Sequence, residues 1–125
     1  MRVVDSSGWI EYLVDAELAD EYDHHLRQLS DIATPTIVMY EVYKRITRDR
    51  GRQAGAMAVA QMMKTKVIPL NEGLALLAGT ISLEHGLHMA DAIIYATAQS
   101  VGAILVTSDE HFETLPGVEY IPRSR

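Results

Sequence analysis

Short segments of strand character alternate with longer helical patterns along the whole sequence. The strand segments are rich in Val and Ile and cover residues 2–5, 31–35, 67–70, 103–107 and 118–121. Consecutive parallel strands need a crossover of about a dozen residues, and the helical patterns supply it. The alternation therefore predicts an α/β fold in which helices cover both faces of a parallel sheet.

The helical patterns carry recognisable start and stop residues. Asp15 is the expected N-cap of the second helix, Gly51 ends the third, and Asn71 caps the fifth. The last helix, MADAIIYATAQSV, is apolar on nearly every face, so we expect it to be deeply buried. The expected helices cover residues 7–14, 15–30, 36–50, 52–65, 71–86 and 89–101.

The composition is that of one globular domain. The chain has 125 residues, 48% of them hydrophobic, and no linker-like stretch or repeat divides it, so we expect a single domain over residues 1–125. The absence of Cys excludes disulfide frameworks and thiol nucleophiles and fits a cytoplasmic protein. We expect no membrane span, and charges at Arg2, Asp5 and Glu11 argue against a signal peptide.

Four acids occupy positions that the predicted fold makes informative. Asp5 ends the first strand, Asp109 lies just beyond the fourth, Asp91 is in the first turn of the buried helix, and Glu41 follows the apolar start of the third helix. Ligand sites in such folds lie beyond the carboxyl ends of the strands, so we expect these acids to converge there. Each also has a simpler reading: Asp5 and Asp109 as N-caps, Asp91 at the positive end of a helix dipole, and Glu41 facing solvent.

Carboxylates brought together in this way repel one another unless a cation lies between them. A donor set of oxygen atoms without Cys favours a hard ion, Mg²⁺ or Mn²⁺. Such ions typically bind phosphates and activate water for attack at phosphorus. The residues alone therefore indicate a metal-dependent enzyme acting on a phosphodiester or a phosphate.

Four segments resemble the acidic blocks of PIN-domain nucleases, and they are VVDSSGWIEYL, PTIVMYEVYK, HMADAIIYATA and LVTSDEHFETLPGV. Their order and spacing are most similar to VapC-type toxins of prokaryotic toxin–antitoxin pairs, from residue 3 to about residue 121. The resemblance implies a three-layer α/β/α fold with a five-stranded parallel sheet. It also implies an endoribonuclease that depends on Mg²⁺ or Mn²⁺ and cuts RNA.

The resemblance also implies roles for individual residues. The catalytic acids and supporting hydroxyls are Asp5, Glu41, Asp91, Asp109, Ser6 and Thr107. Among the acids, Asp5, Asp91 and Asp109 are the expected metal ligands. The family further implies a homodimer and a cognate small antitoxin, which can place a basic side chain in the acidic pocket.

One position departs from the family pattern. Many relatives carry another Asp two residues after the fourth acid, where this sequence has His111. The departure leaves open whether a second metal binds weakly here or whether Glu110 or His111 contributes differently.

A basic segment contrasts with the net charge of −6, since five of the eleven Lys and Arg residues fall between Lys44 and Arg52. Lys44, Arg45 and Arg48 follow Glu41 at separations of three, four and seven, and therefore share helical faces with it. We expect them to guide an RNA backbone toward the acids. The alternatives are a solvated helix face or contact with acidic groups of a partner chain.

Other side chains have two readings each. An aromatic and aliphatic set could form a groove for an antitoxin helix or pack in the core, and comprises Trp9, Tyr12, Leu13, Tyr40 and Tyr43. Met57, Met62 and Met63 are expected in the core or a dimer contact. The adjacent His24 and His25 are expected to be exposed, and Gly86 separates His85 from His88, so neither pair is an expected metal site.

The serious functional alternative is a catalytically silent PIN domain that binds RNA or another protein. Other enzyme classes lack their defining residues. A haloacid dehalogenase phosphatase needs a second Asp where this chain has Ser7, and a receiver domain needs a Lys after its last strands, whereas the last lysine is Lys66. Glycine-rich phosphate-binding motifs are also absent from the sequence.

Overall fold

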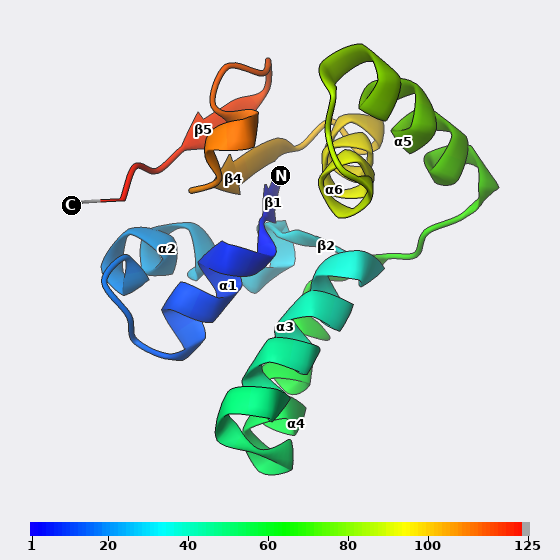
Figure 1. Ribbon diagram of the computed structural model, residues 1–125. Coiled ribbons are helices and arrows are strands. Elements are labelled where there is room, and N and C mark those ends of the chain that lie inside the picture. Colours follow the sequence, from blue (N-terminus) through cyan, green and yellow to red (C-terminus); the bar gives the residue numbers. More distant parts are fainter. Residues whose placement is uncertain (124–125) are drawn as a thin grey trace.

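The computed structural model describes residues 1–123 and contains the predicted alternation of strands and helices (Figure 1). The elements are β1 Arg2–Val4, α1 Ser6–Leu13, α2 Ala19–Leu26, η1 Leu29–Asp31, β2 Ala33–Pro35, α3 Thr36–Arg50, α4 Arg52–Met62, β3 Lys66–Ile68, α5 Glu72–His85, α6 Met89–Ser100, β4 Ile104–Thr107, η2 Glu110–Phe112 and β5 Val118–Tyr120. None of the helices in this range is both long and apolar enough to span a membrane.

The strands are all parallel, as predicted. β1, β4 and β5 form one ladder with β4 in the centre, and β2 pairs with β3 in a second ladder. A single bridge between Arg2 and Ile32 places β2 beside β1, which gives the order β3, β2, β1, β4, β5. The five-stranded sheet is therefore split into regular ladders of three and two strands.

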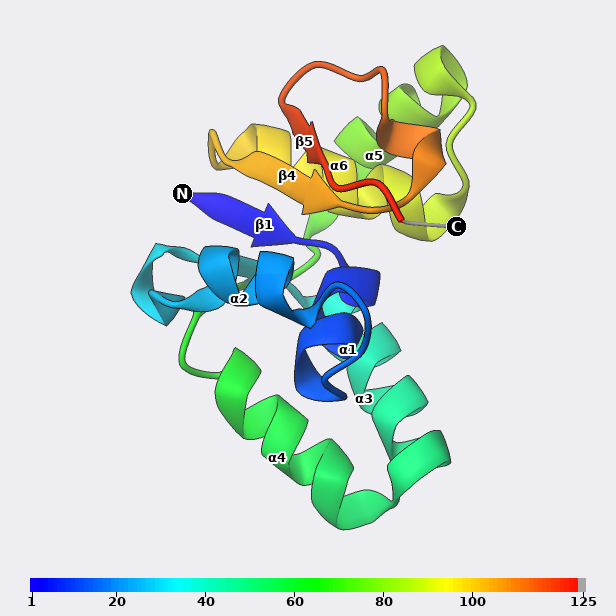
Figure 2. The ribbon, with the colours of Figure 1, turned by 90° about the vertical axis from the view of Figure 1, so that its left-hand side faces the viewer.

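Helices cover both faces of the sheet, which confirms the three-layer α/β/α architecture. In Figure 2, α1 and α2 lie on one side of β1 and β4, while α5 and α6 lie on the other. The run Ala92–Ala98 of α6 is buried throughout, as its apolar composition predicts. Val3 and Val4 of β1 and Leu105 of β4 are fully buried beneath these helices. The hairpin of α3 and α4 extends away from the sheet in both views.

The second helix is the main error of the sequence prediction. Asp15 does not cap it: α2 begins only at Ala19, and Asp15 adopts a positive φ of 55°. The Ala16 N–H bonds the carbonyl of Glu11 at 2.9 Å and the Asp15 N–H bonds that of Tyr12 at 3.3 Å, which is the Schellman pattern that ends a helix. Asp15 therefore terminates α1 and does not initiate α2.

A close contact between α1 and α2 places Tyr22 against the loop that follows β4. Gly8 of α1 lies against the ring of Tyr22 of α2, and a Cβ at position 8 would overlap that ring. Tyr22 is fully buried, and its hydroxyl shares a hydrogen bond of 2.6 Å with the hydroxyl of Ser108. The absence of a side chain at Gly8 thus allows Tyr22 to reach the loop after β4.

We predict that Gly8→Ala lowers the free energy of unfolding by about 1–3 kcal/mol, because the fully buried Tyr22 ring must shift to admit the methyl group. The matched control is Gly79→Ala in α5, where the added Cβ meets open space and the better helix propensity stabilises the protein by about 0.5–1 kcal/mol. Chemical denaturation measures both changes. Equal stability of the two variants would contradict the proposed contact.

Candidate active site

Two of the four acids occupy the carboxyl ends of neighbouring strands. Asp5 follows β1 and Asp109 lies two residues beyond β4, and these strands pair in parallel. Each acid also begins a helix: Asp5 accepts a hydrogen bond from the Ser6 N–H at 2.7 Å, and Asp109 accepts one from the His111 N–H at 2.9 Å. The capping role considered for both acids is therefore present, and it fixes where their carboxylates lie.

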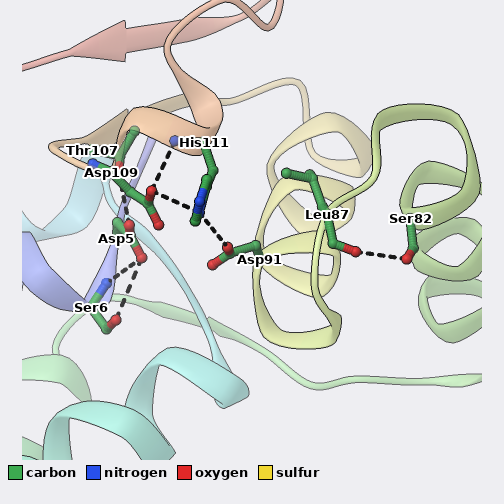
Figure 3. Close-up of polar contacts among 8 residues, drawn as sticks. All are labelled: Asp5, Ser6, Ser82, Leu87, Asp91, Thr107, Asp109 and His111. Atoms are coloured by element: carbon green, nitrogen blue, oxygen red, sulfur yellow. Dashed lines mark hydrogen bonds and ion pairs between the residues drawn. The ribbon is translucent and has the colours of Figure 1, made fainter.

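All four acids line one open cavity of about 340 Å³ at this edge of the sheet. They come from four separate parts of the chain, namely the β1–α1 junction, α3, the start of α6 and the loop after β4. The lining residues are Asp5, Ser6, Ser7, Glu41, Asp91, Ser108, Asp109 and Arg123. Figure 3 shows Asp5, Asp91 and Asp109 with their polar contacts.

Asp5 is the most buried acid of the cavity, with 4% of its surface exposed. Burial raises the pKa of its carboxyl to about 6, and the nearby charges of Asp91 and Glu41 add to the rise. Hydrogen bonds from the Thr107 hydroxyl and the Ser6 N–H oppose the shift. Both burial and the acidic neighbours thus disfavour the ionised form of Asp5.

Thr107 ties the two strand-end acids together. Its hydroxyl donates to Asp5 Oδ2 at 2.7 Å and accepts a hydrogen bond from the Asp109 N–H at 3.0 Å. Thr107 is fully buried, so this geometry is shielded from water. Ser6, the other expected hydroxyl, lies in the cavity wall with its Oγ 3.5 Å from Asp5 Oδ1.

Glu41 projects from the second turn of α3 into the same cavity and does not simply face solvent. Its Oε1 is buried and has no hydrogen-bond partner within residues 1–123. Burial, and secondarily the charge of Asp91, raises the pKa of Glu41, while the Ser6 hydroxyl opposes the rise. A buried carboxylate oxygen without a partner is unfavourable unless a cation or a proton satisfies it.

His111 is the side chain whose role the sequence analysis left open. Its Nδ1 lies 3.2 Å from Asp109 Oδ1 and 3.8 Å from Asp91 Oδ2, so the ring stands between the two carboxylates (Figure 3). Burial and the charge of Asp109 raise the pKa of Asp91, and His111 and His88 oppose the rise. One ligand atom from each of Asp91, Asp109 and His111 lies within 4.8 Å of the others.

The residues of the cavity fit a divalent cation. Four carboxylates line the cavity, and the imidazole of His111 lies against two of them, Asp91 and Asp109. Glu41 supplies a buried oxygen that has no partner in the described part of the chain. Within residues 1–123, the group with the shortest mutual distances is Asp91, Asp109 and His111. Asp5 lies outside this group, and its two carboxylate oxygens are hydrogen-bonded to Ser6 and Thr107.

Lys44, Arg45 and Arg48 lie on α3, the helix that carries Glu41. A second open cavity of about 280 Å³ is lined by Ser6, Ile10, Tyr40, Glu41, Lys44, Arg45 and Arg48. Ser6 and Glu41 line both cavities, so the basic surface is continuous with the acidic one. Arg45 and Arg48 both pair with Asp49, at 3.0 and 2.8 Å, which partly offsets their charge.

Arg123 is a cavity residue that the sequence analysis missed. Its Nη1 donates to Glu11 Oε1 at 2.8 Å, and Glu11 is buried in α1. The partners are 112 positions apart, so no local pattern could have joined them. Arg123 brings a positive charge to the edge of the acidic cavity.

The prediction that His24 and His25 are both exposed is wrong for His25. His25 is buried, and its Nε2 lies 2.9 Å from Glu119 Oε2 of β5. It follows Tyr22 by three residues and therefore shares the buried face of α2, whose other buried residues are Ala19, Tyr22 and Leu26. His24 is exposed, as expected.

The aromatic and methionine sets divide between core and surface. Trp9 and Met62 are fully buried, which supports the core-packing reading for both. Tyr12 and Leu13 line an open groove of about 440 Å³ between α1 and the α3–α4 hairpin. The exposed residues of the two sets are Tyr40, Tyr43, Met57 and Met63.

The geometry defines a class of protein: a three-layer α/β/α fold with an acidic cavity at the carboxyl edge of its parallel sheet. The sequence matches the family model of the PIN domain over residues 2–118. The chain belongs to the PIN domain family. None of the curated proteins matches it.

Solved structures extend this similarity. A chain of a toxin–antitoxin complex from Klebsiella pneumoniae is 25% identical, with a TM-score of 0.80 over 97% of this chain and 100% of that chain. VapC20 of Mycobacterium tuberculosis, described as a toxin that cleaves the sarcin–ricin loop, is 19% identical, with a TM-score of 0.81 over 98% and 100%. VapBC2 from Rickettsia felis, bound to a promoter DNA fragment, is 17% identical, with a TM-score of 0.76 over 95% and 97%.

We predict that the metal-free protein loses stability as the pH rises. The pKa of Asp5 is about 6 in the folded protein against an ordinary value of 3.8, so the folded state holds this proton more tightly than the unfolded state. Asp5 alone therefore lowers the free energy of unfolding by an amount on the order of 3 kcal/mol between about pH 4 and pH 7. Urea denaturation in the presence of a chelator measures the change.

Asp5→Asn should flatten this pH dependence, because the amide does not ionise. The control is Glu84→Gln on the exposed face of α5, which removes the same charge at a position that does not line the acidic cavity and should keep the wild-type slope. A slope that survives unchanged in Asp5→Asn would show that other groups cause it.

Proposed function

We propose that this chain is a single-domain endoribonuclease that depends on Mg²⁺ or Mn²⁺ and acts in the cytoplasm as the toxin of a type II toxin–antitoxin pair. The observation that carries the proposal is the set of four carboxylates around one cavity at the edge of the sheet. Membership of the PIN domain family and the similarity to toxins and toxin–antitoxin complexes support it. RNA is proposed as the substrate because the similar VapC20 is described as a toxin that cleaves the sarcin–ricin loop.

The proposed ligands of the ion are Asp5, Asp91 and Asp109, and Glu41, which lines the same cavity, would act on the attacking water. When bound, the ion supplies Lewis-acid activation of the phosphate and of the attacking water. The raised pKa of Glu41, which is not among the proposed ligands, favours accepting a proton in the cavity. Thr107 holds the Asp5 carboxylate in one orientation through its hydroxyl.

Two protein partners belong to the proposal. The cognate antitoxin is supported by the similar toxin–antitoxin complexes and by the groove that Tyr12 and Leu13 line, whose walls are largely apolar. The homodimer is supported by exposed apolar side chains of α5 and α6, since Leu76, Leu83 and Met89 are 75%, 90% and 72% exposed.

The first prediction of this proposal is that Asp5→Asn and Asp91→Asn each lower metal-dependent RNA cleavage by roughly two orders of magnitude or more. Each amide keeps the side-chain shape and removes a charge that attracts the cation. Cleavage of labelled RNA with Mg²⁺, with Mn²⁺ and with a chelator measures the loss, and circular dichroism checks the fold. Growth arrest on expression of the wild-type chain, absent for Asp5→Asn, tests the toxin role.

Asp20→Asn on the exposed face of α2 is the matched control and should cleave like the wild type. Full activity of Asp5→Asn with unchanged metal dependence would overturn the mechanism. A wild-type chain that binds RNA and cleaves none in either metal would favour the silent RNA-binding module.

The second prediction concerns Lys44, Arg45 and Arg48 as the path of the RNA backbone. The double variant Arg45→Ala, Arg48→Ala should weaken RNA binding and flatten its salt dependence, by a slope of roughly 0.7 for each lost phosphate contact to a single strand. Binding is measured in Asp5→Asn to prevent cleavage. Arg27→Ala at the C-cap of α2 is the control, and identical salt titrations of the double variant and the control would refute the path.

A further inference from the structure

The imidazole of His111 stands where two carboxylates of the cavity converge. Its Nδ1 is 3.2 Å from Asp109 Oδ1 and 3.8 Å from Asp91 Oδ2 (Figure 3). The side chain is 65% exposed, so it is not held there by burial in the core. Its position follows from the η2 helix that Asp109 caps, because the same Asp109 accepts the His111 N–H.

A further small cavity of about 110 Å³ also has Asp91 in its wall. It is lined by His85, Gly86, Leu87, His88, Asp91 and His111. The rings of His88 and His111 are 6.4 Å apart, so a second imidazole is close to the first. Asp91 thus lines both the acidic cavity and a smaller one whose wall contains three histidines.

We propose that Asp91, Asp109 and His111 form a metal position that favours first-row transition ions over Mg²⁺. The inference rests on the proposed function, since it shares Asp91 and Asp109 with that site. Mg²⁺ prefers oxygen donors and retains its water, whereas imidazole nitrogen suits Co²⁺, Ni²⁺ and Zn²⁺. One neutral nitrogen among carboxylates therefore changes which ion the site selects.

A different role for His111 makes the opposite prediction. The same distances suit an ion pair in which a protonated imidazole neutralises Asp91 and Asp109. In that case His111 competes with any cation, and its removal strengthens metal binding. As a ligand, its removal weakens the binding of transition ions and leaves Mg²⁺ binding nearly unchanged.

The experiment compares Co²⁺ and Mg²⁺ binding to the full chain after the purified protein has been stripped with a chelator. Calorimetric titration gives both affinities, and the visible absorption of Co²⁺ reports nitrogen ligation. We expect His111→Ala to weaken Co²⁺ binding roughly ten-fold and to change its spectrum, and His111→Asp to shift the preference toward Mg²⁺. His24→Ala is the matched control, since His24 is exposed on α2.

Two results would overturn the proposal. One is Co²⁺ binding that is equal or tighter in His111→Ala, and the other is a loss that occurs in His88→Ala and not in His111→Ala. If RNA cleavage still depends on Asp5 in either case, the inference about His111 fails and the proposed function stands. A wild-type chain that binds neither ion refutes both.

Discussion

The site depends on one buried hydrogen bond, from the Thr107 hydroxyl to Asp5 Oδ2 at 2.7 Å. It exists because β1 and β4 are parallel neighbours in register, with Val4 opposite Val106, so the residues that follow them meet at the same edge. The bond orients a carboxylate that is 4% exposed, and the same hydroxyl accepts the Asp109 N–H. The register between β1 and β4 thereby sets the relative position of Asp5 and Asp109.

The surroundings of this bond work against the stability of the metal-free protein. Burial and the neighbouring acids raise the pKa values of Asp5, Glu41 and Asp91, so ionisation of each opposes folding. The buried run Ala92–Ala98 of α6 and the core strands compensate by packing that does not involve charge. The stability that this apolar core supplies allows the protein to keep several carboxylates close together at one edge of the sheet.

The sequence predicted the parts of the fold and site that follow from local pattern. Asp5 and Asp109 could be placed because strand ends are readable from Val and Ile runs, and α6 because its apolar residues are continuous. Asp15 was misassigned because a residue suited to an N-cap also tolerates the positive φ of a helix end. The contacts of His25 with Glu119 and of Arg123 with Glu11 join distant parts of the chain, which no local pattern records.

Under the proposed function, a protein of net charge −6 has to accept a polyanion at its acidic cavity. Four carboxylates without a counterion repel phosphate, so the cavity is suited to RNA only when a cation offsets them. The basic face of α3 cannot replace that cation, because Asp49 shares the charges of Arg45 and Arg48. The charge of Arg123 is likewise offset by its ion pair with Glu11. On the proposed function, a divalent ion in the acidic cavity would offset two of the four carboxylate charges, so substrate binding and catalysis would depend on the same event.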